Sequence, residues 1–371
     1  MTTIQTIKEQ LLNNQSLGTD TLHLNLAHCG IQIESNSQTL IDKLRKYFKS
    51  CKVLDDQEQK SSDIKLKILA IESEPPQLDI DFIDWKREPG KTGRKDEYID
   101  IPEGRVVRKV RTGMVFLQSE TDRIAAGPCI QNDNQVINYI NSQYMNWLQN
   151  NGWIICHASG LMSTHADKGI AIAGLSGGGK STLMLQLLNN ENIAYVTNDR
   201  LFIKQLGDSK VGMLGIPKLP RINPGTIVGN SLLHGLMTAE QLSHYQAMER
   251  QKLWDIEEKY DVPVAEVYGE DSIQDGGNLS AFILLNWQRD GDEPVSLIEV
   301  DIHQRKDLLP AIMKSPGPFY QYPDGHFEQD TGEFNQQAYL DALAGVKIYE
   351  AKGSIDFVKM SELCTEVILS Q

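Results

Sequence analysis

The feature that most constrains this chain is a glycine-rich string near its middle. Residues 174–181 read Gly-Leu-Ser-Gly-Gly-Gly-Lys-Ser, which fits the phosphate-loop (Walker A) pattern G-x-x-x-x-G-K-S/T. The string follows the apolar run GIAIAG at 169–174 and overlaps the start of the apolar run STLMLQLL at 181–188. Such runs, separated by glycines, predict a buried strand, a tight loop and a helix in succession. The string therefore predicts an α/β fold built around a phosphate-binding loop.

Each position of the string has a chemical reason. Glycines let the backbone curl until successive N–H groups point inward and bind phosphate oxygens. Lys180 adds positive charge near the β- and γ-phosphates, and the hydroxyl of Ser181 is a ligand for Mg²⁺. A helix that begins at Lys180 directs its positive dipole end towards the nucleotide. We therefore expect ATP and Mg²⁺ to bind at one run of residues: Gly174, Leu175, Ser176, Gly177, Gly178, Gly179, Lys180, Ser181 and Thr182.

Asp199 is the candidate metal-holding carboxylate. It ends the apolar run IAYVTND at 193–199, which predicts a strand. The 19-residue spacing from Lys180 to Asp199 is just long enough for a helix and a parallel return strand. We therefore expect Asp199 to close the strand beside the phosphate-loop strand and to hold Mg²⁺ together with Ser181. An ordinary surface aspartate in a turn is the alternative.

His157 is a further candidate. It lies on the predicted strand 153–162 (WIICHASGLM), which precedes the phosphate-loop strand. A lone histidine on a strand is more often packed or exposed than catalytic, so the residues alone leave its role open.

Charge and cysteine usage exclude several classes of protein. The net charge is −14, from 36 Lys plus Arg against 50 Asp plus Glu, which disfavours nucleic-acid and anionic-membrane partners. The five cysteines are widely spaced and form no CxxC pair, which argues against a disulfide framework or a zinc site. The first 15 residues contain an acidic residue and no apolar stretch, so we expect no signal peptide there, and no apolar run approaches the roughly 20 residues that span a bilayer. These observations predict a cytoplasmic location.

The apolar periodicity predicts two domains. A helical stripe over 133–150 ends at Asn150-Asn151-Gly152, a helix C-cap signal. We place the boundary there, between a smaller α+β domain at 1–150 and a phosphate-loop domain at 151–371. The expected elements of the second domain, besides those named above, are a hairpin at 201–216, a helical segment at 238–260, strands at 280–287, 295–301 and 346–351, and helices at 303–313, 336–344 and 360–369.

Three segments resemble the HPr kinase/phosphorylase family, and more closely the HprK-related kinases. They are CHASGLM (156–162), GIAIAGLSGGGKSTL (169–183) and VTNDRLFI (196–203). The continuation GIPKLPRINPGT (215–226) is similar to the branch called HprK-related kinase B. The resemblance implies a bent, mixed sheet of the type shared with phosphoenolpyruvate carboxykinase. It also implies ATP, Mg²⁺ and phosphoryl transfer to a hydroxyl, which in HPr kinase itself is a protein serine.

The resemblance assigns roles by position. Lys180 and Ser181 match the phosphate and metal residues, Asp199 matches the second of two consecutive aspartates, and His157 matches a histidine near the acceptor. Asn198 stands where the family has its first aspartate, which resembles the general base, and an amide cannot take that proton.

Two further positions depart from the family pattern. Thr182 replaces an acidic residue. Of the later Glu-x-Arg-Gly motif, Arg221 in Pro220-Arg221-Ile222-Asn223 is the nearest candidate. Arg221 would contact the transferring phosphoryl group, unless it is a surface arginine in a proline-rich loop.

The leading hypothesis is therefore an ATP-dependent kinase. Its candidate catalytic residues are His157, Asp199, Lys180 and Arg221. Because Asn198 cannot be the base, Asp199 or His157 would have to orient the acceptor hydroxyl. The alternative is a nucleotide-binding regulator that transfers nothing, whereas a motor or transport ATPase is disfavoured. Protein serine, sugar and small metabolite all remain open as acceptor, and so does a homo-oligomeric state.

Overall fold

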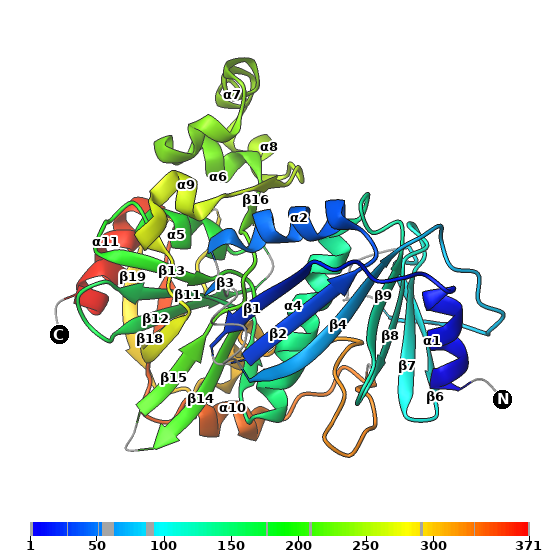
Figure 1. The fold of residues 1–371 in the computed structure, drawn as a ribbon. Coiled ribbons are helices and arrows are strands. Elements are labelled where there is room, and N and C mark those ends of the chain that lie inside the picture. The colour runs from blue at the N-terminus through cyan, green and yellow to red at the C-terminus, as the bar shows by residue number, and fades with distance from the viewer. Residues whose placement is uncertain are drawn as a thin grey trace. The chain divides into compact units, whose positions relative to one another are not determined.

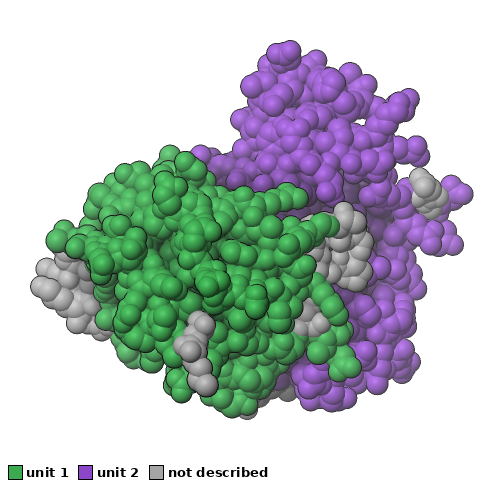
Figure 2. Space-filling view, turned by 90° about the vertical axis from the view of Figure 1, so that its right-hand side faces the viewer, with its two compact units in different colours: residues 1–152, 315–333 green, residues 153–314, 334–371 purple. Residues whose placement is uncertain are grey.

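The chain forms two compact units in this computed structural model, which describes residues 3–27, 29–50, 52–53, 63–86, 93–175, 177–207, 210–289, 292–329 and 331–369. Unit 1 comprises residues 1–152 and 315–333, and unit 2 comprises residues 153–314 and 334–371 (Figures 1 and 2). The sequence places one boundary near residue 150. It gives no sign that residues 315–333, from the second half of the chain, pack with the first unit.

Unit 1 is a mixed α/β unit. Its sheet has the order β3-β1-β2-β4-β9-β8-β7-β6-β5, in which β4 is parallel to β2 and to β9 and the other pairs are antiparallel. The strands are β1 (Thr21–Leu26), β2 (Cys29–Ser35), β3 (Lys52–Val53), β4 (Ile64–Glu72), β5 (Ile83–Asp84), β6 (Asp96–Ile101), β7 (Gly104–Lys109), β8 (Val115–Ser119) and β9 (Arg123–Gly127). Its helices are α1 (Ile4–Leu12), α2 (Gln38–Tyr47), α4 (Asp133–Asn150) and a 3₁₀ turn at Phe48–Ser50.

Unit 2 is built on a second mixed sheet. Its order is β10-β14-β15-β18-β12-β11-β13, and β20 pairs with both β18 and β19. The strands are β10 (Ile154–Cys156), β11 (Ala158–Ser163), β12 (Gly169–Gly174), β13 (Ile193–Thr197), β14 (Leu201–Gly207), β15 (Lys210–Leu214), β18 (Gly276–Leu285), β19 (Ser296–Val300) and β20 (Lys347–Lys352). Strand β12 is parallel to β18 and antiparallel to β11, which in turn is antiparallel to β13. Strand β11 thus separates the phosphate-loop strand from β13, so the expectation that these two are neighbours was wrong.

Two layers of apolar side chains hold the helices on this sheet, because alternate residues of each strand face opposite sides. On one side, Leu183 and Leu187 of α5 (Lys180–Leu187) and Met360 of α11 (Phe357–Leu369) pack with Ile172 of β12. On the other side, Ala171 of β12 packs in a cluster that includes the helix α10 (Gln336–Ala342). The helix after the phosphate loop is therefore fixed by its own apolar run.

The remaining elements of unit 2 are short. Between β15 and β18 the chain forms a two-stranded ribbon and a group of small helices, which Figure 1 shows gathered beside the sheet. They are β16 (Arg221–Ile222), α6 (Pro224–Val228), a 3₁₀ helix (Ser231–Leu236), α7 (Ala239–Gln246), α8 (Arg250–Trp254), β17 (Tyr260–Asp261), α9 (Val264–Tyr268) and a 3₁₀ turn (Glu270–Ser272). The predicted helical segment 238–260 is thus two helices and a strand. The predicted helix 303–313 is a 3₁₀ helix at Lys306–Ala311 that contains Pro310.

No helix among the described residues is both long and apolar enough to cross a membrane.

Glu350 of β20 anchors the segment that follows β18. Its side chain is fully buried and accepts hydrogen bonds from Asn286 (2.7 Å) and Arg305 (3.0 Å), with Lys352 3.1 Å away. Burial opposes ionisation, but the hydrogen bonds from Arg305, Asn286 and Lys352 lower the pKa of Glu350 to about 2. A depressed carboxyl pKa adds stability above the unfolded-state pKa, and this stability is lost as the pH falls towards 2.

We predict that Glu350→Gln destabilises the chain and flattens the pH dependence of its unfolding between about pH 4.5 and pH 2. The loss at neutral pH should be on the order of 2 kcal/mol, because Arg305 loses a buried partner. Denaturant unfolding of the full chain measures both effects. The control is Asp307→Asn, which removes the exposed partner of the same arginine and should leave stability close to wild type.

Candidate functional site

The loop between β12 and α5 has the backbone geometry of an anion-binding turn. Gly177 and Gly179 have φ angles of 79° and 89°, in the left-handed region that side chains disfavour. Gly179 is the N-cap of α5, which begins at Lys180. The free N–H groups and the positive end of the helix dipole therefore meet at this loop. Ser176, predicted to be part of the loop, lies outside the described residues.

An aromatic pair that the sequence did not reveal supports this loop. The indole Nε1 of Trp287 donates a hydrogen bond of 2.8 Å to the carbonyl of Gly178. Trp287 and Phe357 meet edge to face at 5.2 Å, and a β-carbon on Gly179 would lie 2.7 Å from the Phe357 ring. Gly179 is thus required both by its φ angle and by this close approach. The guanidinium of Arg289 lies beside Gly177, 3.6 Å from where a β-carbon on that glycine would be.

The strand order brings the predicted residues together. Strand β11 runs antiparallel to both neighbours, so its first residues lie beside the carboxyl ends of β12 and β13: Ala158 pairs with Ala173, and Gly160 pairs with Thr197. His157 occupies the single-residue break between β10 and β11. It is therefore not on a strand, as expected, but at a corner between two. Asp199 follows the end of β13.

His157 is the centre of the resulting cluster. Its Nε2 atom lies 3.1 Å from Nζ of Lys180 and 3.1 Å from Oδ1 of Asp199. One nitrogen cannot accept from the ammonium and donate to the carboxylate in the same protonation state. The neutral tautomer that carries its proton on Nδ1 favours the contact with Lys180, and a protonated Nε2 favours the contact with Asp199.

Asn198 links the phosphate-loop helix to the same corner. Its buried amide oxygen accepts hydrogen bonds from Ser159 Oγ (2.7 Å) and from Ser181 Oγ (3.1 Å). The hydroxyl of Ser181, which was predicted to bind Mg²⁺, is thus engaged by the amide of Asn198. The hydroxyl of Thr182 lies 2.7 Å from that of Thr226 on α6, so it is engaged as well.

Asp199 is held in an unusual conformation and a positive field. Its φ of 73° is left-handed, which an aspartate tolerates better than most residues. Desolvation opposes its ionisation, but the hydrogen bond from His157 and the charges of Lys314, Arg200 and Lys180 hold the pKa of Asp199 well below its usual range. The Lys314 ammonium is 3.4 Å from its second carboxylate oxygen. Asp199 is therefore ionised at every physiological pH.

Two lysines near Asp199 were not identified from the sequence. Burial, together with the charge of Arg200, lowers the pKa of Lys218 to about 8. Burial also lowers the pKa of Lys180, which Asp199 partly offsets. Lys218 lies within the segment GIPKLPRINPGT (215–226), but nothing in that segment indicated a role for it. No local pattern marks Lys314, which the fold brings in from more than 100 residues away.

Arg221, the fourth predicted catalytic residue, lies on β16. Its side chain is about half exposed and pairs with Asp261 of β17 at 3.0 Å. Its charge contributes to the field at Lys218, but its ion pair is with Asp261 and not with the cluster around His157.

Ser181 and Asp199 are the candidate protein ligands for Mg²⁺. Among the described residues, no group of three or more His, Cys, Asp or Glu side chains is placed to hold a metal. Ser181 and Asp199 offer two oxygens near the loop. Mg²⁺ commonly binds through one or two protein oxygens, with phosphate oxygens and water completing its shell. The residues present therefore fit a nucleotide-bound Mg²⁺ better than a metal held by the protein alone.

Comparison with known proteins adds little. No protein-family model and no curated protein matches the chain. Among solved structures, the chain is similar to the HPr(Ser) kinase/phosphatase from Coxiella burnetii, with 14% sequence identity and a TM-score of 0.28. The alignment covers 58% of this chain and 93% of that one. We draw no conclusion about activity from so distant a likeness.

We predict that Asp199→Asn lowers the thermal midpoint by about 3 °C at low ionic strength, because it leaves the surrounding lysine and arginine charges uncompensated. Asparagine also tolerates the left-handed backbone, so the change isolates the charge. In about 1 M salt, where the Debye length is about 3 Å, most of the loss should disappear. Thermal unfolding at the two ionic strengths measures this.

The matched control is Asp261→Asn, which removes the partner of the exposed Arg221. It should change the midpoint little at either ionic strength. If both variants behave alike, the field around Asp199 has no special effect on stability.

Proposed function

We propose that unit 2 is an ATP-dependent kinase of the HPr kinase/phosphorylase-like type, similar to HprK-related kinase B, that transfers the γ-phosphoryl group to a hydroxyl acceptor. One observation carries the proposal: Lys180 at the start of α5 and Asp199 after β13 both lie 3.1 Å from His157 Nε2. A phosphate-binding lysine, an ionised carboxylate and an imidazole thus meet beside a loop with anion-binding geometry. Phosphoryl transfer is catalysed mainly by positioning and by stabilisation of charge, which groups of these kinds can provide.

The proposed roles follow from the chemistry of each residue. The N–H groups of residues 174–182 and the ammonium of Lys180 bind and orient the nucleotide phosphates. Ser181 and Asp199 would hold Mg²⁺, which neutralises phosphate charge when it is bound. Ser181 would exchange its hydrogen bond to Asn198 for this contact. The Lys218 and Lys314 ammonium groups add positive charge where charge develops in the transition state.

The acceptor hydroxyl is oriented by Asp199 or His157. A carboxylate whose pKa is this low is a weak base, but it remains an acceptor that can orient a hydroxyl. The transition state of phosphoryl transfer is loose, so positioning contributes more to the rate than proton removal does. With Lys180 turned towards the phosphates and Asp199 towards Mg²⁺, His157 would lose both contacts of its Nε2 atom, and the neutral tautomer with its proton on Nδ1 could then accept the hydroxyl proton.

A second function, a nucleotide-binding regulator without transferase activity, is favoured by one specific observation. Asn198 occupies the position of the family's base, and it holds Ser181 through a hydrogen bond instead of offering a carboxylate. For either function we propose a cytoplasmic protein that binds neither nucleic acid nor membrane. The acceptor (protein serine, sugar or small metabolite) and a homo-oligomeric state are left open.

We predict that Lys180→Ala weakens Mg²⁺·ATP binding by about tenfold or more, since it removes a charged hydrogen-bond donor from the phosphates. Isothermal titration of ATP into the full chain with Mg²⁺ measures the affinity. The control is Lys252→Ala, an exposed lysine of α8, which should bind as the wild type does. Undiminished affinity in Lys180→Ala would sink the nucleotide assignment for both functions.

We predict that His157→Gln lowers phosphoryl transfer by about 100-fold while ATP affinity changes little. Transfer is measured as label from γ-labelled ATP incorporated by components of a cell lysate, with Lys180→Ala as the blank. Loss of transfer with intact nucleotide binding supports the kinase and a role for His157 at the acceptor. Nucleotide binding without any transfer by the wild type would favour the regulator.

A further inference from the structure

Arg289 lies beside the phosphate loop, at the end of a segment that the sheet of unit 2 holds in place. The amide of Asn286 donates to the carbonyl of Ala351 (3.0 Å), and the amide of Gln288 donates to the carbonyl of Gly353 (3.0 Å). These bonds extend the parallel pairing of β18 with β20 beyond the two strands. The backbone that leads to Arg289 is therefore fixed within unit 2, while its long side chain can still change rotamer.

The guanidinium of Arg289 faces the open side of Gly177. A β-carbon on Gly177 would lie 3.6 Å from Nη2 of Arg289, and no other atom of the described residues, apart from the neighbours of Gly177 in the chain, would come within 4 Å of it. Gly179 is different, because a β-carbon there would lie 2.7 Å from the Phe357 ring. The space beside Gly177 is thus open and has a cation at its edge.

Two residues at the end of α8 contact this guanidinium. The ring centre of Trp254 lies 5.4 Å from the guanidinium carbon, within cation–π range. Nη1 of Arg289 lies 3.5 Å from Oδ1 of Asp255. This ion pair is long and exposed, with 47% of the arginine side chain and 77% of the aspartate side chain accessible to solvent. Exposed pairs of this kind contribute little stability, so Arg289 can exchange Asp255 for a stronger anion at small cost.

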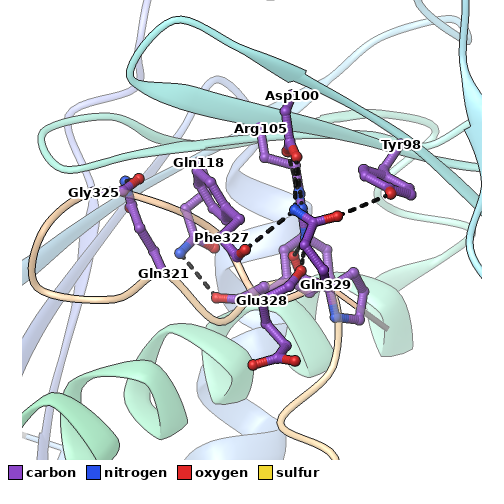
Figure 3. Close-up of polar contacts among 11 residues, drawn as sticks. Tyr98, Asp100, Arg105, Gln118, Gln321, Gly325, Phe327, Glu328 and Gln329 are labelled. Atoms are coloured by element: carbon purple, nitrogen blue, oxygen red, sulfur yellow. Dashed lines mark hydrogen bonds and ion pairs between the residues drawn. The ribbon is translucent and has the colours of Figure 1, made fainter. Parts of the chain in front are cut away.

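An arginine with a structural role in the same chain has very different surroundings. Arg105 of unit 1 is fully buried and bonded to the carboxylate of Asp100. Its guanidinium also donates to the carbonyls of Pro318 (3.0 Å) and Glu328 (2.9 Å), as Figure 3 shows. Among the described residues, the one hydrogen bond from the Arg289 guanidinium is its long contact with Asp255. Arg289 therefore keeps N–H groups for a ligand that Arg105 uses within the protein.

Phosphate is the ligand that suits this position. A guanidinium presents a planar fork of N–H groups that can bind phosphate oxygens in pairs, and such charge-assisted bonds are among the strongest in proteins. The neighbouring glycine loop offers backbone N–H groups to the same kind of ligand. Arg289 comes from the segment after β18, whereas Lys180 begins α5, where its Nζ atom lies 3.1 Å from Nε2 of His157. Two separate elements thus bring cations to the loop.

We propose that Arg289 binds the phosphates of the nucleotide at the edge of the loop, and that Asp255 is the partner within the chain with which those phosphates compete. The inference rests on the nucleotide binding proposed above, and it holds for a kinase and for a regulator alike. Bound phosphate draws the guanidinium away from Asp255. By reciprocity, nucleotide binding then loosens the tie between α8 and the loop.

Isothermal titration of Mg²⁺·ATP into the full chain tests both parts of the proposal. Arg289→Gln should weaken binding by about tenfold, because it removes a charged donor from the phosphates. Asp255→Asn should tighten binding by about threefold, since it removes a competing anion from an exposed ion pair. In the double variant the tightening should vanish, because no guanidinium remains to be released.

Two neighbouring variants control for the change in net charge. Arg250→Gln removes an exposed arginine whose guanidinium lies 4.5 Å from the centre of the same tryptophan ring. Glu249→Gln removes an exposed carboxylate next to it in the chain. Neither change should alter the affinity for Mg²⁺·ATP. Equal losses in Arg250→Gln and Arg289→Gln would overturn the proposal, and so would equal tightening by Glu249→Gln and Asp255→Asn.

Inorganic tripolyphosphate, titrated with Mg²⁺ in place of ATP, separates the phosphates from the nucleoside. The same losses and gains are expected with this probe. A response to ATP but not to tripolyphosphate would place Arg289 at the nucleoside and overturn the phosphate assignment. A wild type that binds neither probe would refute the proposed nucleotide site, and this inference with it. Binding by the wild type that is undiminished in Arg289→Gln would refute this inference alone.

Discussion

The antiparallel course of β11 is the constraint on which the candidate site depends. If β12 and β13 were adjacent parallel strands, the break before β11 would not lie beside the carboxyl ends of both. Because β11 runs between them in the opposite direction, its start lies beside both of their carboxyl ends. His157 is thereby placed between Lys180 and Asp199, which come from the elements that follow those ends. The register of one strand thus assembles three groups that are distant in sequence.

The local charge around the candidate site is opposite in sign to the net charge of the molecule. The chain has a net charge of −14, yet the neighbours of Asp199 that set its pKa are Lys314, Arg200 and Lys180. Lysines that are partly removed from water cost free energy unless an anion compensates them. Asp199 supplies one negative charge, which leaves a positive excess. A polyanionic ligand that enters this region is therefore attracted locally in spite of the long-range repulsion of the surface.

Local patterns in the sequence predicted the elements but not their partners. The apolar stripe and the C-cap gave the helix at 133–150 with both of its ends, and the glycine string gave the start of α5 at Lys180. Strand pairing was not predictable, because apolar runs record burial and not neighbours. For the same reason, the strand that leads to Asp199 was wrongly predicted to lie directly beside the phosphate-loop strand. Lys314 and Trp287 lie in no recognisable sequence motif. Only long-range packing brings them to the candidate site.

Unit 1 is built from two stretches of the chain that are far apart in sequence, and this has a consequence for biosynthesis. A chain emerging from a ribosome presents residues 1–152 long before residues 315–333. Until then the guanidinium of Arg105 and the amides of Gln118 and Asn146 lack their backbone partners and must be satisfied by water. Domains usually fold as units in the order of synthesis. Here the first unit cannot be completed until most of the second has been made, so the two parts mature together and not one after the other.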